Sequence, residues 1–386
     1  MDYRTSKRIV MNIKAFVKKE IVFCVSVFLA VASSLITCPT ARMMLSFCDW
    51  RVIVLLFSLM LVIQAFKSEN VLDNAAVWIL RLCPSVRSLY FSFTFLVFFS
   101  SMAVTNDVAL LTFVPLSILV CKMADIPSVM LVILETVAAN LGSCVTPMGN
   151  PQNLFLYSFY SIPVVDFFKT TLVIAIPSFI LLFVSVIFIT AGEKNKPFFF
   201  SKNDFSFHPV RRVRTSVYSV VMLVILLSVF RIIDYRIGFI FTLISILLCN
   251  RHLLKKVDYC LLMTFCAFFV FTKNCTSVPG LSSTISSVLK SPGVVFGVSI
   301  AASQVISNVP AALLLSNFTE ETHALLLGVN AGGLGTLIAS LASVISYKLY
   351  NSENANTSGI YLLKFTVVNI IFMILLIPLC LLFVNR

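Results

Sequence analysis

The pattern N-x-G-x-x-x-T occurs twice in the chain, as NLGSCVT at Asn140–Thr146 and as NAGGLGT at Asn330–Thr336. Each copy follows an apolar block that a hydroxyl residue and an asparagine split, Thr105-Asn106 in the first half and Ser307-Asn308 in the second. Each copy is followed by one last uninterrupted apolar helix. The same order of features in both halves predicts an internal duplication.

The composition around these stretches is that of a membrane protein. Of the 386 residues, 59% are hydrophobic and 12% are charged, and the mean hydropathy is +1.01. A soluble domain has about 25% charged residues, so this chain lacks the charges for a water-exposed surface. A water-soluble enzyme of this size is therefore excluded, and the sequence predicts an all-α polytopic membrane protein.

The net charge of +13 is interpreted as a topology signal rather than as a sign of nucleic-acid binding. We place the N-terminus in the cytoplasm and treat both split blocks as re-entrant hairpins. Most of the 29 Lys and Arg residues then fall on the cytoplasmic side, as the positive-inside rule requires. The two hairpins enter from opposite sides, so the halves are inverted copies. We therefore expect a multi-pass protein of the cytoplasmic (inner) membrane with no nucleic-acid partner.

This topology divides the chain into four parts. They are a cytoplasmic segment at residues 1–20, a first transmembrane repeat at 21–190 with its hairpin near 89–121, a cytoplasmic loop at 191–215, and a second, inverted repeat at 216–386 with its hairpin near 293–318. Backbone leaves helical geometry at membrane depth only where it is buried in protein or lines a wet cavity. Two hairpins and two broken helices therefore indicate a central cavity.

Polar residues at the breaks are the candidate ligands for a solute and a coupling ion. Helix ends present free N–H and C=O groups there, and glycines let the backbone approach a ligand closely. The candidates are Thr105, Asn106, Asp107, Asn140, Thr146, Gly149, Asn150 and Asn153 in the first half, and Ser307, Asn308, Asn330, Gly332, Gly333, Gly335 and Thr336 in the second. Small residues can instead serve tight helix packing. Paired breaks in inverted repeats are typical of secondary transporters.

Two acidic residues, Asp107 and Glu135, lie within the expected spans. A carboxylate inside a membrane is costly and indicates function. Asp107 directly follows the broken Thr-Asn pair, so it is the better candidate for carrying a coupling proton or binding a cation. Glu135 either faces the same cavity or is a protonated residue bonded to a neighbouring helix. Because we find no basic residue deep in the membrane, we expect helix dipoles and amides to hold an anion.

The sequence gives no indication of a metal centre, a cofactor or an enzyme active site. The 11 cysteines form no CxxC pair, and the 3 histidines have no partner at metal-binding spacing. Sodium at the hairpin tips is the metal ion that this interpretation allows. An intramembrane enzyme would need a nucleophile with a base or a pair of metals, so an enzyme is the disfavoured alternative, as is a passive channel.

Four strings resemble the ion transporter superfamily, which includes citrate-transporter-like anion permeases, arsenite permeases, divalent-anion/sodium symporters and certain sodium/proton antiporters. They are SMAVTNDVALLTFVP at Ser101–Pro115, GSCVTPMGNPQN at Gly142–Asn153, SNVPAALLL at Ser307–Leu315 and GVNAGGLGTLIASLAS at Gly328–Ser343. The resemblance implies Ser/Thr-Asn motifs at the hairpin tips, unwound helix segments, and substrate and coupling ions bound between them. It also implies a scaffold subdomain, a transport subdomain that moves as an elevator, and often a homodimer.

Two departures from the resemblance narrow the expected substrate. The first tip reads Thr-Asn-Asp where dicarboxylate symporters have Ser-Asn-Thr, and Leu337 stands where the first unwound segment has Pro147. Both argue against sodium-coupled dicarboxylate uptake. We therefore expect a secondary active transporter for a small anion or oxyanion, such as citrate or arsenite, driven by a proton or sodium gradient. The alternative within the superfamily is a sodium/proton antiporter with Asp107 and Glu135 as cation ligands.

Overall fold

The computed structural model describes residues 20–81, 83–193 and 207–385, and within these ranges the regular structure is helical. Eight of the described helices are long and apolar enough to cross a membrane. The predicted fold class, an all-α polytopic membrane protein, is thereby confirmed. The predicted N-terminal segment up to residue 19 and residues 194–206 of the predicted central loop lie outside the described residues.

The first half contains one hairpin and one broken helix. Its helices are α2 (Ile21–Thr37), α3 (Ala41–Phe47), α4 (Trp50–Ser68), α5 (Val71–Leu80), α6 (Val86–Val104), α7 (Asn106–Met123), α8 (Val129–Ser143), α9 (Pro151–Phe159) and α10 (Val164–Ile189), followed by the 3₁₀ turn η1 (Ala191–Glu193). The hairpin consists of α6 and α7. The broken helix consists of α8 and α9, and residues 144–150 form the unwound segment between them.

The second half repeats this order. Its elements are α11 (Arg212–Val229), α12 (Tyr235–Asn250), η2 (Arg251–Lys256), α13 (Tyr259–Thr276), α14 (Pro279–Val288), α15 (Pro292–Ile306), α16 (Asn308–Leu315), α17 (Thr322–Ala331), η3 (Leu337–Ala339), α18 (Leu341–Glu353), η4 (Ala355–Thr357) and α19 (Ser358–Val384). The hairpin consists of α15 and α16. The broken helix consists of α17 and α18, separated by the unwound segment 332–340.

The short helices α3 and α14 were not expected from the sequence. The sequence of α14 is PGLSSTISSV, which is too short and too rich in serine to be recognised as a membrane span, although its apolar residues at 281, 285 and 288 have helical spacing. Its proline stands at the first helical position, where proline favours helix initiation. Residues 282–288 of α14 and helix α15 meet at an angle of 110°. α14 joins α13 to the second hairpin as α5 joins α4 to the first, so the two ten-residue helices are counterparts.

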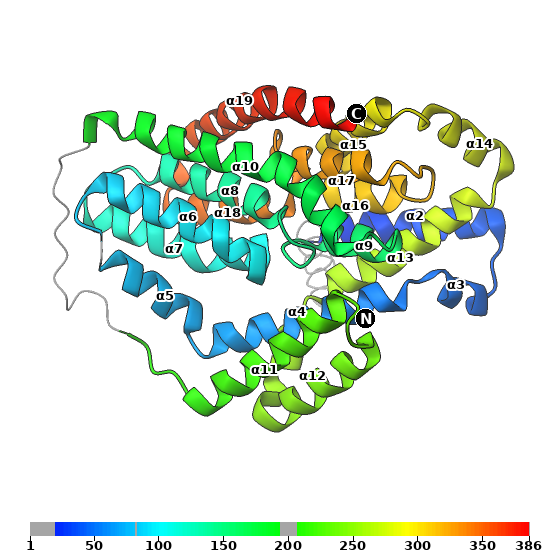
Figure 1. Cartoon of the computed structure of the whole chain (residues 1–386), viewed down its shortest axis with the longest axis horizontal. Coiled ribbons are helices and arrows are strands. Elements are labelled where there is room, and N and C mark those ends of the chain that lie inside the picture. Colours follow the sequence, from blue (N-terminus) through cyan, green and yellow to red (C-terminus); the bar gives the residue numbers. More distant parts are fainter. Residues whose placement is uncertain (1–19, 82, 194–206, 386) are drawn as a thin grey trace, which may run out of the picture.

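The helices form two groups (Figure 1). In the first group α2 packs on α13, α4 packs on α12, and α11 packs on both α4 and α12. We call these five helices the five-helix bundle. The helices α6–α10 and α15–α19 form the second group, the hairpin bundle. Its central helix is α8, in which every residue from Leu131 to Ser143 is buried.

Packing inside the hairpin bundle is reciprocal between the two halves. α6 packs on α8 as α15 packs on α17, and α7 packs on α18 as α16 packs on α9. Each hairpin therefore contacts the first part of its own broken helix and the second part of the other one. Contacts of this reciprocal kind are those of a twofold axis. They agree with the inverted repeat that the sequence predicts.

Candidate functional site

Both hairpins turn at a residue with a strained backbone. Thr105, between α6 and α7, has φ 69° and ψ 149°, and Ser307, between α15 and α16, has φ 74° and ψ 153°. This region is populated almost only by glycine, and another residue in it costs about 1–3 kcal/mol. Two non-glycine residues with nearly the same dihedral angles show that the tips are built alike. Strain of this kind clusters at functional sites.

The glycine of each motif lets the broken helix approach its own hairpin. A Cβ atom on Gly142 would lie 2.2 Å from the carbonyl oxygen of Phe98, and one on Gly332 would lie 2.7 Å from Oγ of Ser303. Real Cβ atoms do not come so close to other heavy atoms, so a side chain at either position would push the helices apart. Both glycines therefore permit close packing of the broken helix on its hairpin.

The threonine of each motif ties the unwound segment to the last turn before the tip. Thr146 Oγ1 donates a hydrogen bond to the carbonyl oxygen of Met102 in α6. Thr336 Oγ1 donates to the carbonyl oxygen of Gln304 in α15 at 3.2 Å. The Thr336 N–H also donates to Oε1 of Gln304 at 2.8 Å. Both predicted threonines therefore hold the breaks in shape.

The asparagine of the first motif bonds to the second half of the chain. Asn140 Nδ2 donates to Ser343 Oγ at 3.1 Å and to the carbonyl oxygen of Gly333 at 3.5 Å. Its Oδ1 accepts from Ser340 Oγ at 2.9 Å and from Asn106 Nδ2 at 3.4 Å. One buried amide thus joins the first tip to the second broken helix.

The asparagine of the second motif makes the matching bonds to the first half. Asn330 Nδ2 donates to Asn153 Oδ1 at 2.8 Å, and Asn150 Nδ2 donates to Asn330 Oδ1 at 3.4 Å. Asn150 and Asn153 stand at the same spacings after Asn140 as the two serines stand after Asn330. We call these reciprocal bonds the asparagine brace. Since its amide groups bond to one another, to serine hydroxyls and to backbone, they are engaged within the protein.

The two tips contact the unwound segments through different groups. At the first tip the Asn106 N–H donates to the carbonyl oxygen of Gly149 at 3.1 Å. At the second tip Ser307 Oγ donates to the carbonyl oxygen of Ala339 at 3.4 Å. A Cβ atom on Gly333 would lie 2.8 Å from Nδ2 of Asn308, so glycine is needed there for the tip to approach. Gly335, with φ +99°, occupies a backbone conformation that favours glycine.

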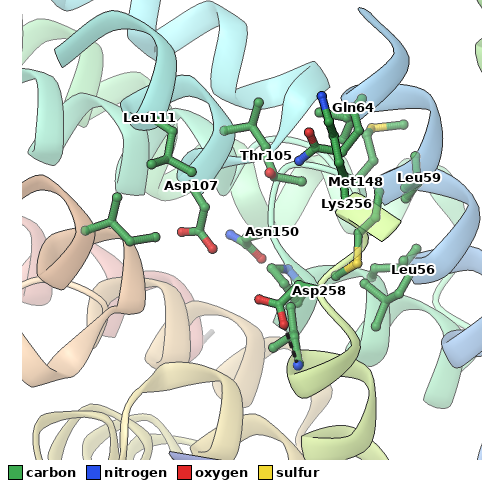
Figure 2. Close-up of a pocket in the computed structure, with 17 residues that line it drawn as sticks. Leu56, Leu59, Gln64, Thr105, Asp107, Leu111, Met148, Asn150, Lys256 and Asp258 are labelled. Carbon is green, nitrogen blue, oxygen red and sulfur yellow. Dashed lines mark hydrogen bonds between the residues drawn. The ribbon is translucent and has the colours of Figure 1, made fainter. Parts of the chain in front are cut away.

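A pocket lies between the first tip and the five-helix bundle (Figure 2). The hairpin bundle contributes Thr105, Asp107 and Asn150, together with apolar side chains of α7 and α9. The five-helix bundle contributes Gln64, Lys256 and Asp258, together with apolar side chains of α4. In Figure 2 the carboxylate of Asp107 points toward the amide of Asn150. Polar groups from both bundles therefore share one space.

Most of the residues selected from the sequence do not line this pocket. Those outside its wall are Asn106, Asn140, Thr146, Gly149, Asn153, Ser307, Asn308, Asn330, Gly332, Gly333, Gly335 and Thr336. They belong to the asparagine brace, the tips and the unwound segments. The repeated motifs therefore mark the residues that shape the breaks, and three of the fifteen candidates border the pocket.

The two acidic candidates have different surroundings. Asp107 is half-buried, and its carboxylate makes no hydrogen bond or ion pair with residues in the described ranges. Glu135 is fully buried and accepts a hydrogen bond at Oε1 from Ser117 of α7. Glu135 is absent from the wall of this pocket, and its bond to Ser117 joins α8 to α7. Among the described residues, no three His, Cys, Asp or Glu side chains gather as a metal site.

Three polar residues that line the pocket beside the five-helix bundle were not expected from the sequence: Gln64, Lys256 and Asp258. Lys256 ends η2, and Asp258 caps α13 by accepting from the Leu261 N–H at 2.9 Å. In the sequence both stand in a short polar connection between apolar helices, where charges indicate topology. Gln64 could have been found, because it is a polar residue within the apolar helix α4.

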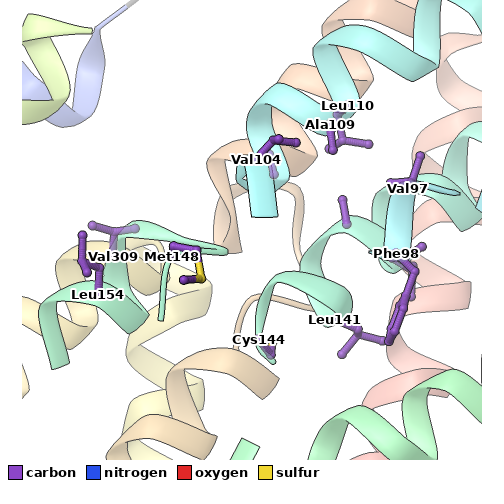
Figure 3. Close-up of a cluster of buried hydrophobic side chains, with 14 of the residues drawn as sticks. Val97, Phe98, Val104, Ala109, Leu110, Leu141, Cys144, Met148, Leu154 and Val309 are labelled. Carbon is purple, nitrogen blue, oxygen red and sulfur yellow. The ribbon is translucent and has the colours of Figure 1, made fainter. Parts of the chain in front are cut away.

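The residue that matches Asp107 at the second tip is apolar. Val309 follows Asn308 as Asp107 follows Asn106, and its side chain is 5% exposed. It belongs to a cluster of buried hydrophobic side chains that also includes Leu154 of α9 (Figure 3). The chemistry of the two tips therefore differs at one position.

Comparison with known proteins agrees with this architecture. Residues 9–324 match the family model described as citrate transporter, CitMHS. An uncharacterized transporter of Methanocaldococcus jannaschii is 32% identical over 308 residues, which cover 79% of this chain and 82% of that protein. The inner membrane protein YbiR of Escherichia coli K12 is 28% identical over 312 residues, which cover 79% of this chain and 81% of that protein.

The family match extends over most of the chain and includes both hairpins. It agrees with the resemblance to the ion transporter superfamily, which includes citrate-transporter-like permeases. The eight apolar helices and the transporter relatives together make this a multi-pass membrane transporter. The chain belongs to the CitMHS citrate transporter family.

Proposed function

We propose that the protein is a secondary active transporter that moves a small anion or oxyanion across the cytoplasmic (inner) membrane, driven by a proton or sodium gradient. The observation that carries this proposal is the asparagine brace beside a pocket that contains Asp107. Two inverted half-sites joined at their breaks suit alternating access, in which one site opens to each side in turn.

The division into two bundles supports an elevator movement. The pocket lies between the bundles, and its polar groups come from both. The ten-residue helices α5 and α14 connect the five-helix bundle to the hairpins. In our proposal these two helices act as arms, the five-helix bundle is the scaffold, and the hairpin bundle carries the solute.

Asp107 is the proposed coupling residue. It stands in the first turn of α7, where the helix dipole favours a negative charge. Because its carboxylate faces the pocket and has no protein partner in the described ranges, it is free to take a proton or a sodium ion. An intramembrane carboxylate of this kind is characteristic of transport pathways.

The proposed orientation places the N-terminus in the cytoplasm. The charge asymmetry of the sequence supports it, and the name of the Escherichia coli relative, inner membrane protein, supports the membrane. In this orientation α4 ends and α13 begins on the cytoplasmic side. The pocket, which contains Gln64 of α4 and Lys256 beside α13, then opens toward the cytoplasm.

Flux measurements in proteoliposomes test the coupling role. We expect Asp107→Asn to reduce gradient-driven flux of radiolabelled citrate or arsenite about a hundredfold, comparable to the loss of a proton-transferring group in an enzyme. Asp125→Asn is the matched control, since Asp125 is exposed just beyond the other end of α7 and asparagine tolerates its φ of 53°. Gradient-driven flux that survives Asp107→Asn would contradict the proposal.

A sodium/proton antiporter is the second candidate, and one observation favours it. Asp107 and Asp258 line the same pocket from opposite bundles, so two carboxylates border one space. The test is to add sodium to proteoliposomes without any organic anion and to record the internal pH. A pH change that Asp107→Asn abolishes would support the antiporter, whereas a constant pH together with anion flux would support the first proposal.

A further inference from the structure

Among the described residues that line the pocket, the one basic side chain is Lys256, which ends η2 and lies next to α4 and α12 of the bundle that we propose as the scaffold. We propose that Lys256 binds the carboxylate group of an anionic cargo, and that it does so on one side of the membrane only. This inference rests on the proposed transport function. Lys256 would thereby select a carboxylate over an uncharged oxyacid. Arsenous acid is uncharged at neutral pH and would gain nothing from the ammonium group.

The ammonium group of Lys256 is available for this role. Lys256 is exposed, and it makes no ion pair or hydrogen bond with residues 20–81, 83–193 or 207–385. A lysine ammonium has three donors and no acceptor, so its unmet bonds favour an anion. Asp258, two residues later, is engaged at the N-cap of α13, where it accepts from the Leu261 N–H.

The groups that the sequence proposed as anion ligands are engaged elsewhere. The side-chain amides of Asn140 and Asn330 bond across the two halves, and Asn150 Nδ2 donates to Asn330 and to Ser143. A donor already bonded inside the protein can hold a cargo only by losing that bond. Among the pocket-lining groups in the described residues, the Lys256 ammonium is therefore the strongest donor that has no such loss.

The two unpartnered charges stand on opposite walls. Asp107 lies on α7 in the hairpin bundle, and Lys256 ends η2 beside the five-helix bundle (Figure 2). A carboxylate cargo accompanied by a proton or a sodium ion matches this pair, because the anion meets Lys256 while the cation meets Asp107. An attraction between opposite charges is strengthened where the walls are apolar.

The one-sidedness follows from where Lys256 is attached. In an elevator movement the hairpin bundle carries Asp107 and Asn150 away, while Lys256 stays with the scaffold. The position related to Lys256 by the internal pseudosymmetry, which lies on the opposite side of the membrane, is not a lysine. α4 and α13 are counterparts in the reciprocal packing, and their N-caps are Asp49 and Asp258. Two residues before each cap stand Phe47 and Lys256, so the cation belongs to one face.

The test measures citrate flux separately from each face of the membrane, in proteoliposomes whose full-length protein has a known orientation. We expect Lys256→Gln to raise the KM for radiolabelled citrate about tenfold from the face on which this pocket opens, the order of one charge-assisted hydrogen bond. The maximal rate, and the KM from the other face, should stay within about twofold. Lys256→Arg should keep the parental KM.

Lys255→Gln is the matched control, because Lys255 is the adjacent exposed lysine and does not line the pocket. If the parent carries citrate and Lys256→Gln behaves like Lys255→Gln at both faces, the role of Lys256 is refuted and the transporter proposal stands. If the parent carries arsenite and no citrate, the carboxylate class is wrong while transport remains. If the parent carries neither, the proposed function itself fails, and this inference fails with it.

Discussion

The two hairpin tips have the same backbone and different chemistry. Thr105 and Ser307 adopt the same strained conformation, and each precedes an asparagine that begins the next helix. The next residue is Asp107 at the first tip, where it faces a pocket, and Val309 at the second, where it is buried among apolar side chains.

This difference shows that the two repeats share their architecture but do not share their charged residues. Backbone strain, glycine contacts and the asparagine brace occur in both halves, so they serve the shape that both repeats need. The tip carboxylate, Asp107, occurs only in the first half, and the pocket lysine, Lys256, has no counterpart at the matching place in the first half. The fold is therefore close to symmetric, while the charged site is confined to one side of it.

The largest expected effect comes from making the second tip like the first. Val309→Asp places a carboxylate among apolar side chains with no cation at hand, which should lower the free energy of unfolding by about 3–5 kcal/mol. Val309→Ala, the control for lost volume, should cost roughly 1–2 kcal/mol. Both are measured by denaturant unfolding in detergent. If Val309→Asp is as stable as Val309→Ala, the second tip is as wet as the first and the comparison fails.

A smaller effect should separate the two motif glycines. Gly142→Ala meets a backbone carbonyl of Phe98, which can move only with its helix, so we expect a cost of about 3 kcal/mol. The nearest atom to a Cβ at Gly332 is Oγ of Ser303, a side-chain atom, and the expected cost is roughly 1–2 kcal/mol.

The same unfolding assay compares the two glycine variants, and combining each with Ser303→Ala tests whether the contact with Ser303 causes the loss. That change removes the hydroxyl nearest to Gly332, so it should recover part of the loss in Gly332→Ala. It should recover nothing in Gly142→Ala, because its site is in the other half. Equal losses at both glycines, with no rescue, would show that the two contacts are equally rigid.

The smallest effect concerns the motif threonines. Thr146 is half-buried and bonds to Met102, so Thr146→Val should cost about 1 kcal/mol through an unmet carbonyl. Thr336 is exposed, water can replace its bond to Gln304, and Thr336→Val should cost less than about 0.5 kcal/mol. Thermal denaturation of both variants compares them. A larger loss at Thr336 would show that the exposed threonine contributes more to stability than the half-buried one, contrary to this expectation.

The fold could be predicted from the sequence because the residues at the helix breaks form a recognisable local pattern. Asparagine, glycine and threonine at fixed spacing are rare inside apolar helices, so Asn140 and Asn330 identified both broken helices. The roles within the motif were less accessible. Whether an amide bonds to a cargo or to the other repeat depends on contacts between residues far apart in the sequence, such as Asn140 and Ser343, which are 203 positions apart.

The pocket was the least predictable part. Its wall needs a residue from each bundle, and Lys256 stands in a polar connection where a lysine normally reports only orientation. The buried Glu135 shows the opposite case. Its place inside an apolar helix indicated function, and the structure gives it a bond to Ser117 away from the pocket.

The asparagine brace has a consequence for the origin of the chain. In these bonds the motif asparagine belongs to one repeat and its partner to the other, so one repeat alone leaves its asparagine without the partners that the other repeat supplies. A half-length ancestor could have formed the same bonds only with a second copy of itself, turned over in the membrane. Fusion of two such genes would then fix both orientations in one polypeptide and leave each tip free to diverge, as Asp107 and Val309 have done.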